Sequence, residues 1–244
     1  MKNDIKVVLF DLGNTLIRDE PASWADVYVL ADRSLWSSLR KFGVNTSTHE
    51  LFGDHKTLLD YYYKLREGDL EEPGIGTVLR DLLNEHKIQL SDEKLQSALR
   101  SMYAVTQTNW FIEDDAIPTL QVLLKSSYRL GIISNGSDDS NTYELLEKTR
   151  LQTYFEFILS SAAFGKRKPH PGIFRAALDH FQVSPEQTVM VGDNYEADIL
   201  GARQLGMNTI WITRRLSSLS GDPRLPEETV TSRLSEIPVL LSSR

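Results

Sequence analysis

The stretch IKVVLFDLGN, residues 5–14, is the segment from which the fold of this chain can be inferred. Apart from Lys6, its first six residues are apolar and rich in β-branched side chains, which is typical of a short buried strand. The next four residues, Asp11-Leu12-Gly13-Asn14, are typical of a turn. The stretch therefore predicts a buried strand that ends in a polar turn.

Further along the chain, similar apolar runs alternate with helical patterns. The runs occupy residues 130–134, 155–160, 188–191 and 209–213, and amphipathic helical spacing occurs near residues 115–127, 138–149, 171–181 and 195–205. Residues 228–241 add a weak strand and a short apolar helix. Strands that alternate with helices pair in parallel through right-handed crossovers. The pattern predicts an α/β fold with a doubly wound parallel sheet.

A long helical segment separates the first strand from the second. From about residue 20 to 112, apolar residues recur at helical spacing, as in Trp24, Val27 and Ala31, and no convincing strand is found. A simple strand-helix-strand unit needs only about 30 residues. We therefore expect a core domain of residues 1–18 and 112–244, and an inserted helical domain of residues 19–111. The alternative is that these helices extend the main core.

The composition excludes several classes of protein. The chain has 244 residues, of which 41% are hydrophobic and 25% charged, so wholesale disorder is excluded. It has no cysteine, which excludes disulfide scaffolds, thiolate metal sites and cysteine nucleophiles. A net charge of −7 argues against nucleic acid or an anionic membrane as a partner. We find no membrane span or signal peptide, and expect a cytoplasmic monomer or homodimer.

Polar residues follow each of the central strands. In an open parallel sheet, ligands bind beyond the carboxyl ends of the strands, so these residues are expected to share one site. In strand order they are Asp11, Gly13, Asn14 and Thr15; Ser134 and Asn135; Lys166 and Lys168; and Asp193 and Asp198. Each also has a structural interpretation, because Asp and Ser favour turns and helix N-termini.

Together these residue types suit the handling of a phosphate group. A carboxylate at a strand end can attack phosphorus and form an aspartyl-phosphate. Neighbouring carboxylates repel each other unless a cation lies between them, and Mg²⁺ prefers oxygen ligands. A hydroxyl, an amide and a helix N-terminus can hold phosphate oxygens, and a lysine can balance their charge.

Four segments in order resemble the haloacid dehalogenase-like (HAD) hydrolase superfamily. They are VVLFDLGNTL at 7–16, LGIISNG at 130–136, KPHPGIF at 168–174 and VMVGDNYEADILGA at 189–202. The resemblance implies a Rossmann-like core, with the helical insertion as a C1-type cap. It also implies a Mg²⁺-dependent phosphatase that hydrolyses a phosphomonoester or acyl phosphate of a small phosphorylated metabolite.

The resemblance also implies roles for residues in these motifs. Asp11 would be the nucleophile and a Mg²⁺ ligand. The backbone carbonyl of Gly13 and the carboxylate of Asp193 would be further Mg²⁺ ligands. Ser134 would bind the phosphoryl group, with Asn135 beside it.

The remaining roles concern the lysine and the groups behind it. Lys168 would bridge the nucleophile and the substrate; Lys166 competes for this role but lacks the Lys-Pro-x-Pro context. Asp198 would orient Lys168 or a metal-bound water. Thr15, like Asp198, would support the groups that contact the ligand.

Gly13 departs from the pattern of the resembled phosphatases, which usually carry a second Asp at this position as the acid and base. Three explanations stay open: Asp19 or Glu20 replaces it, the substrate has a good leaving group, or the protein is a weak or non-enzymatic binding relative. A 2-haloacid dehalogenase is a further alternative, because halide displacement needs no acid. In the insertion, the aromatic residues are expected to be mostly core, with one or two facing the substrate; they are Trp24, Tyr28, Trp36, Tyr61, Tyr62, Tyr63, Trp110 and Phe111.

Overall fold

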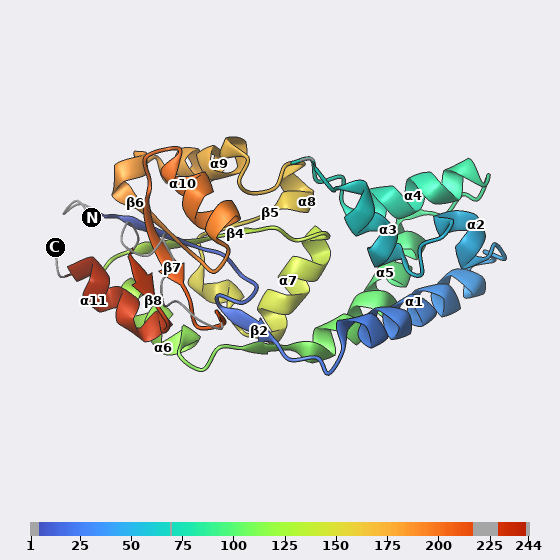
Figure 1. The fold of residues 1–244 in the computed structure, drawn as a ribbon, viewed down its shortest axis with the longest axis horizontal. Coiled ribbons are helices and arrows are strands. Elements are labelled where there is room, and N and C mark those ends of the chain that lie inside the picture. The colour runs from blue at the N-terminus through green and yellow to red at the C-terminus, as the bar shows by residue number, and fades with distance from the viewer. Residues whose placement is uncertain (1–4, 69, 217–228, 243–244) are drawn as a thin grey trace.

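A six-stranded sheet forms one part of the molecule, seen here in a computed structural model that describes residues 5–68, 70–216 and 229–242 (Figure 1). Every pair of neighbouring strands is parallel. The spatial order is β5 (Phe157–Ser160), β4 (Arg129–Ser134), β1 (Val7–Phe10), β6 (Thr188–Gly192), β7 (Asn208–Ile212) and β8 (Val230–Thr231). The expected α/β fold with a parallel sheet is therefore confirmed.

Helices connect these strands close to where the sequence predicts them. They are α6 (Ala116–Lys125), α7 (Asp139–Lys148), α8 (Ser161–Phe164), α9 (Pro171–Phe181), α10 (Gly201–Arg203) and α11 (Ile237–Ser242). The helix expected at 195–205 begins as a π-helical segment, Tyr195–Leu200, before α10. Short 3-10 turns cover Gln107–Asn109, Gln152–Tyr154, Pro185–Gln187 and Leu234–Glu236. Residue 228, where the last predicted strand starts, lies outside the described residues.

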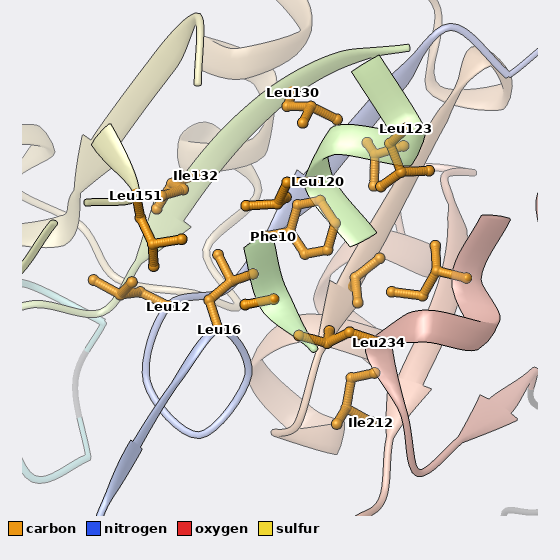
Figure 2. Close-up of a cluster of buried hydrophobic side chains, with 14 of the residues drawn as sticks. Phe10, Leu12, Leu16, Leu120, Leu123, Leu130, Ile132, Leu151, Ile212 and Leu234 are labelled. Atoms are coloured by element: carbon orange, nitrogen blue, oxygen red, sulfur yellow. The ribbon is translucent and has the colours of Figure 1, made fainter. Parts of the chain in front are cut away.

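The two faces of the sheet are covered by different helices. Side chains alternate along a strand, so Val8 and Phe10 face one way and Val7 and Leu9 the other. Figure 2 shows Phe10 packed among Leu120, Leu123 and Leu130, in the cluster that α6 and α11 complete. Val7 and Leu9 belong to a second cluster, which α9 covers. Burial on both faces explains why β1 is apolar throughout and holds the turn at residue 11 rigidly.

The five α-helices between β2 (Ile17–Asp19) and β3 (Trp110–Ile112) form a second part of the molecule, at the right in Figure 1. They are α1 (Trp24–Lys41), α2 (Thr48–Phe52), α3 (Leu58–Leu65), α4 (Ile75–Glu85) and α5 (Asp92–Thr106), called the helical insert below. The insert has its own hydrophobic cluster, which includes Leu35, Phe52 and Leu79. A separate cluster supports the proposal of an inserted domain at 19–111, whose boundaries stay a prediction.

Two short strands connect the insert to the sheet domain. β2 (Ile17–Asp19) and β3 (Trp110–Ile112) pair in antiparallel fashion, so the chain enters and leaves the insert side by side. The expectation that no strand occurs between residues 20 and 112 is wrong at β3. Three residues are too few to show the alternation that identifies a strand in sequence. No helix among the described residues is long and apolar enough to cross a membrane.

Candidate active site

A cavity of about 450 Å³ lies where the carboxyl ends of the strands meet the helical insert. Both parts of the molecule contribute to its wall. The sheet domain contributes Asp11, Gly13, Ser134, Asn135, Lys168, Asp193 and Asp198, and the insert contributes Trp24, Tyr28, Tyr63, Arg66 and Tyr103. The structure therefore brings together most of the residues that the sequence places at strand ends.

Asp11 is held at the end of β1 by its backbone and its side chain. Its N–H donates to the carbonyl of Val191 at 2.8 Å, which continues the pairing of β1 with β6. The Nζ of Lys168 donates to Asp11 Oδ1 at 2.7 Å. Asp11 is only 8% exposed, so its carboxylate is presented to the cavity and not to bulk water.

Lys168 is buried among oxygen atoms. Its Nζ donates to the carbonyl of Ile133 at 2.7 Å and lies 2.7 Å from Asp198 Oδ1. Burial by itself opposes the charged form, but Asp11 and Asp198 outweigh it and raise the pKa of Lys168 above its usual value. Lys168 is therefore an ammonium ion at neutral pH. Lys166, the competing lysine, pairs with Glu71 of the insert and does not line the cavity.

Three carboxylates gather around this lysine. Oxygen atoms of Asp11, Asp193 and Asp198 all lie within 4.8 Å of one another. Burial and the neighbouring charges of Asp11 and Asp198 raise the pKa of Asp193 to about 7. Burial also raises the pKa of Asp198, to about 6, against the opposing effect of Lys168. One lysine does not balance three carboxylates, and a set of hard oxygen donors fits Mg²⁺.

Gly192 permits this close packing at the end of β6. A Cβ atom at Gly192 would lie 2.2 Å from Asp198 Oδ2, a distance that no real pair of atoms tolerates. The backbone N–H of Asn194 donates to the same carboxylate at 3.0 Å. The absence of a side chain at Gly192 thus lets Asp198 fold back under the strand end and reach Lys168.

Ser134 is the last residue of β4 and Asn135 follows it, and both line the cavity. The amide of Asn135 bonds twice to the backbone of Lys168: its oxygen accepts from the N–H at 2.8 Å and its nitrogen donates to the carbonyl at 3.0 Å. Asn135 therefore positions the segment that carries the lysine, and its phosphate contact stays a prediction. Neither residue caps α7, because Asp138 does so through Asn141.

The loop after Asp11 contains two further polar residues, Asn14 and Thr15. Thr15 is fully buried, and its hydroxyl has no hydrogen-bond partner among the described residues. It does not line the cavity, and its supporting role stays a prediction. Asn14 lines the cavity with a left-handed φ of 56°. An Asn adopts this conformation more readily than most residues, which fits the tight turn here.

Trp110 lies where an acidic side chain at position 13 would project. A Cβ atom built on Gly13 would lie 3.4 Å from the indole ring of Trp110. Of the two residues offered as substitutes for the missing acid, Asp19 lines the cavity and accepts from Trp24 Nε1 at 2.5 Å. Glu20 instead pairs with Arg18 at 2.6 Å and is not part of the cavity wall.

The insert contributes residues that the sequence did not assign. Of its aromatic residues, Trp24, Tyr28, Tyr63 and Trp110 line the cavity, which is more than the expected one or two. Arg66 and Tyr103 also line it and had not been identified as site residues. Arg66 follows Tyr63 by three residues, close to one helical turn, so the two side chains are neighbours, but no sequence signal places them in the cavity.

Comparisons with known proteins agree with this geometry. The chain is 30% identical over 217 residues to a glyceraldehyde 3-phosphate phosphatase of Pyrococcus furiosus, covering 85% of this chain and 80% of that protein. It is 27% identical to a phosphoserine phosphatase of Thermus thermophilus, with 96% of each chain covered.

A similar solved structure is that of a 2-haloacid dehalogenase from Pseudomonas syringae. It has a TM-score of 0.67 and 30% identity, and the match covers 98% of this chain and 99% of that one. A model of the haloacid dehalogenase-like hydrolases matches residues 5–206, which is most of the chain and includes every strand-end residue described above. The chain therefore belongs to the haloacid dehalogenase-like hydrolase family.

Proposed function

We propose that this hydrolase is a Mg²⁺-dependent phosphatase, which cleaves a phosphomonoester or acyl phosphate of a small metabolite through an aspartyl-phosphate on Asp11. The observation that carries the proposal is the buried ammonium of Lys168 between Asp11 and Asp198, with Asp193 beside them. Relatives named as phosphatases, for glyceraldehyde 3-phosphate and phosphoserine, support it.

In the proposed reaction, Asp11 supplies the nucleophile. One of its carboxylate oxygens forms a bond to phosphorus while the bond from phosphorus to the leaving oxygen breaks. Lys168 donates to Asp11 and compensates the negative charge that gathers on the phosphoryl oxygens. Ser134 and the backbone that follows it hold those oxygens in place. Water then attacks the phosphorus of the aspartyl-phosphate, so that inorganic phosphate leaves and the carboxylate of Asp11 is restored.

Mg²⁺ would be held by the carboxylates of Asp11 and Asp193 and by the backbone carbonyl of Gly13. When bound, the ion would neutralise charge on the phosphoryl group and relieve the repulsion between the carboxylates. Asp198 would stay paired with Lys168 and fix its position.

The leaving oxygen must gain a proton or depart as a stable anion. Gly13 has no proton to give, and Trp110 occupies the adjacent space. General acid help is worth about 10²- to 10⁴-fold in rate, so its absence favours substrates whose leaving group departs readily. Acyl phosphates have such leaving groups. We therefore expect acetyl phosphate to be a better substrate than an alkyl or aryl phosphate.

The test is phosphate release from acetyl phosphate and p-nitrophenyl phosphate, measured with Mg²⁺ and with EDTA. We expect release that needs Mg²⁺ and that falls to background in Asp11→Asn. Asp114→Asn, which changes a carboxylate that is 97% exposed, is the matched control and should retain the activity. Phosphate release by Asp11→Asn at the wild-type rate would disprove the assignment of the nucleophile.

The main competitor is a 2-haloacid dehalogenase, because a dehalogenase structure is similar and halide displacement needs no acid at Gly13. The cluster of three carboxylates argues against it, since alkyl-halide displacement has no phosphoryl charge for a cation to balance. Halide release from a 2-haloacid in EDTA, without any phosphate release, would replace the phosphatase proposal. Binding of phosphate without turnover of either substrate would instead support a binding protein.

A further inference from the structure

Arg66 is a cation on the wall of the active-site cavity that the proposed chemistry does not use. It is the C-cap residue that directly follows α3, and its side chain is 16% exposed. It lines the same cavity as Asp11 and Lys168, but it belongs to the helical insert and they belong to the sheet domain. Its charge therefore comes from the opposite part of the cavity wall to the proposed nucleophile.

The guanidinium of Arg66 is held by buried partners. Its Nη1 donates to the hydroxyl of Tyr62 at 2.9 Å and to Glu72 Oε2 at 3.1 Å. Tyr62 is fully buried and Glu72 is 2% exposed. The guanidinium carbon also lies 5.2 Å from the ring centre of Tyr62 and 5.1 Å from that of Tyr63, which are cation–π distances. Arg66 is thus fixed in direction, unlike a surface arginine.

The anchor of Arg66 is itself attached to the sheet domain. Ser161, the first residue of α8, donates its hydroxyl to Glu72 Oε2 at 3.0 Å, and the N–H of Glu72 donates to the carbonyl of Gly165 at 3.0 Å. Glu72 therefore connects the insert to the same side of the sheet that carries Lys168. This link fixes the position of Arg66 relative to the nucleophile, as a specificity residue requires.

The charges around the cavity show what Arg66 can bind. The charge of Lys168 is paired with the carboxylates of Asp11 and Asp198. The hydrogen bonds that Arg66 donates to Tyr62 and Glu72 both come from its Nη1. A guanidinium carries five N–H donors in a planar fork that matches an oxyanion. The rings of Tyr28 and Tyr63 flank this part of the cavity and reduce its water content, which strengthens a charged contact.

We propose that Arg66 binds a second oxyanion, on the leaving part of the substrate, so that among phosphate esters those with a second anionic group are preferred. The oxyanion is a carboxylate or a second phosphate group. This inference rests on the proposed phosphatase function. Without such a role, Arg66 would only neutralise Glu72, and its removal would not distinguish charged substrates from neutral ones.

The test compares matched substrates that differ in the second anionic group. One pair is 2-phosphoglycolate and ethyl phosphate, which differ by a carboxylate; the other is fructose 1,6-bisphosphate and fructose 6-phosphate, which differ by a phosphate. We expect the wild type to prefer the anionic member of at least one pair. Arg66→Met should reduce that preference in kcat/KM by about 10- to 100-fold, mainly through KM, because a charge-assisted hydrogen bond is lost. The pair that responds identifies the oxyanion.

Two control variants separate binding from folding. Arg80→Met removes an arginine of α4 that pairs with Asp92 outside the cavity, and should keep the wild-type preference. Arg66→Met removes one cation and one hydrogen-bond donor from the buried carboxylate of Glu72 and leaves Arg167 as the nearby positive charge, which weakens the fold. The double variant Arg66→Met with Glu72→Gln avoids that buried charge and should show the same loss of preference.

A binding measurement distinguishes failure of this inference from failure of the proposed function. Calorimetric titration of Asp11→Asn with phosphonoacetate and ethylphosphonate needs no turnover. Tighter binding of phosphonoacetate that disappears with Arg66→Met supports the inference even if no ester is hydrolysed. Asp11-dependent hydrolysis with no preference within either pair, or a preference unchanged by Arg66→Met, would overturn it and leave the phosphatase standing.

Discussion

Gly13 lies two residues after Asp11, the proposed nucleophile, and the indole ring of Trp110 lies against it. A Cβ atom at this position fits at ordinary contact distance, 3.4 Å from the ring. A longer acidic side chain at position 13 would share this space with Trp110.

Gly13→Asp alone is accordingly expected to give little increase in rate. Gly13→Asp with Trp110→Ala provides both the acid and the space for it, and should speed hydrolysis of phenyl phosphate up to about 100-fold. Acetyl phosphate, whose leaving group needs no proton, should gain much less. Steady-state rates for both substrates check this, with Trp110→Ala as the control. Equal gains for both substrates would refute the explanation that the missing acid limits the rate.

At the scale of elements, α1 and α3 of the insert are joined by a buried carboxylate. Asp32 of α1 is 8% exposed and accepts from the backbone N–H of Leu58, the first residue of α3, at 3.2 Å. The N-terminus of a helix favours a negative charge, but burial has the larger effect and raises the pKa of Asp32 to about 6. The charged form of Asp32 thus destabilises the folded insert at neutral pH.

The sign of this effect gives a stability prediction. The pKa of Asp32 in the folded state lies above its ordinary value of 3.8, so the folded state binds the proton more tightly. The cost of the buried charge is absent below about pH 4 and complete well above about pH 6. Asp32→Asn keeps an oxygen for Leu58 and should stabilise the protein by on the order of 1 kcal/mol at pH 8. Thermal unfolding should show a smaller gain in stability at pH 5 than at pH 8. The control is Asp54→Asn, at an exposed position, which should show no such trend. A gain from Asp32→Asn that grows on acidification would contradict the prediction.

The elements that the sequence predicts well are those with a long or uniform pattern. β1 is apolar over its whole length because both faces are covered, and α1 repeats its apolar residues over several turns. β2 and β3 were not predicted because each has three residues and owes its existence to the pairing of the two insert connections. The π-helical start of Tyr195–Leu200 was likewise missed, since no local spacing distinguishes it from an α-helix.

The site residues divide in the same way, into those that a local sequence pattern predicts and those that depend on distant contacts. Asp11 and Asp193 could be found because each directly follows a strand, and Lys168 because it lies in the loop region after β5; strand ends of a parallel sheet meet at one edge. Arg66 and Trp110 could not, because their place in the cavity depends on how the insert lies against the sheet. That arrangement depends on contacts such as Glu72 with Ser161, which join residues far apart in the chain. Local patterns carry no information on such pairs.

For the whole molecule, the cavity is the place where its two separately packed parts meet. The sheet domain and the insert each have a hydrophobic cluster of their own. The groups between them are polar, including the hydroxyl of Tyr103 with that of Ser137 at 3.1 Å and the N–H of Ile75 with the carbonyl of Ser137 at 2.9 Å. A polar contact between separately stable parts allows relative movement, and closure over the substrate would exclude water.

The carboxylate cluster links the charge of this cavity to the stability of the whole protein. Asp11, Asp193 and Asp198 lie together with one lysine, and a cation that binds only the folded state stabilises it. Mg²⁺ at about 100 times its Kd would add about 2.7 kcal/mol, which shifts Tm by several degrees in a protein of this size. Thermal unfolding in Mg²⁺ and in EDTA measures this shift without any substrate.

Asp193→Asn makes the prediction specific, because it should raise the Tm of the metal-free protein and reduce the rise in Tm that Mg²⁺ causes. The pKa of Asp193 is raised to about 7, so its charge destabilises the metal-free fold at pH 8. In EDTA the variant should therefore unfold at a higher temperature than the wild type. The increase in Tm from EDTA to Mg²⁺ should be much smaller for the variant than for the wild type. Asp114→Asn, at an exposed carboxylate, should follow the wild type in both. An equal Mg²⁺ shift in Asp193→Asn and the wild type would place the cation elsewhere and remove the metal from the proposed mechanism.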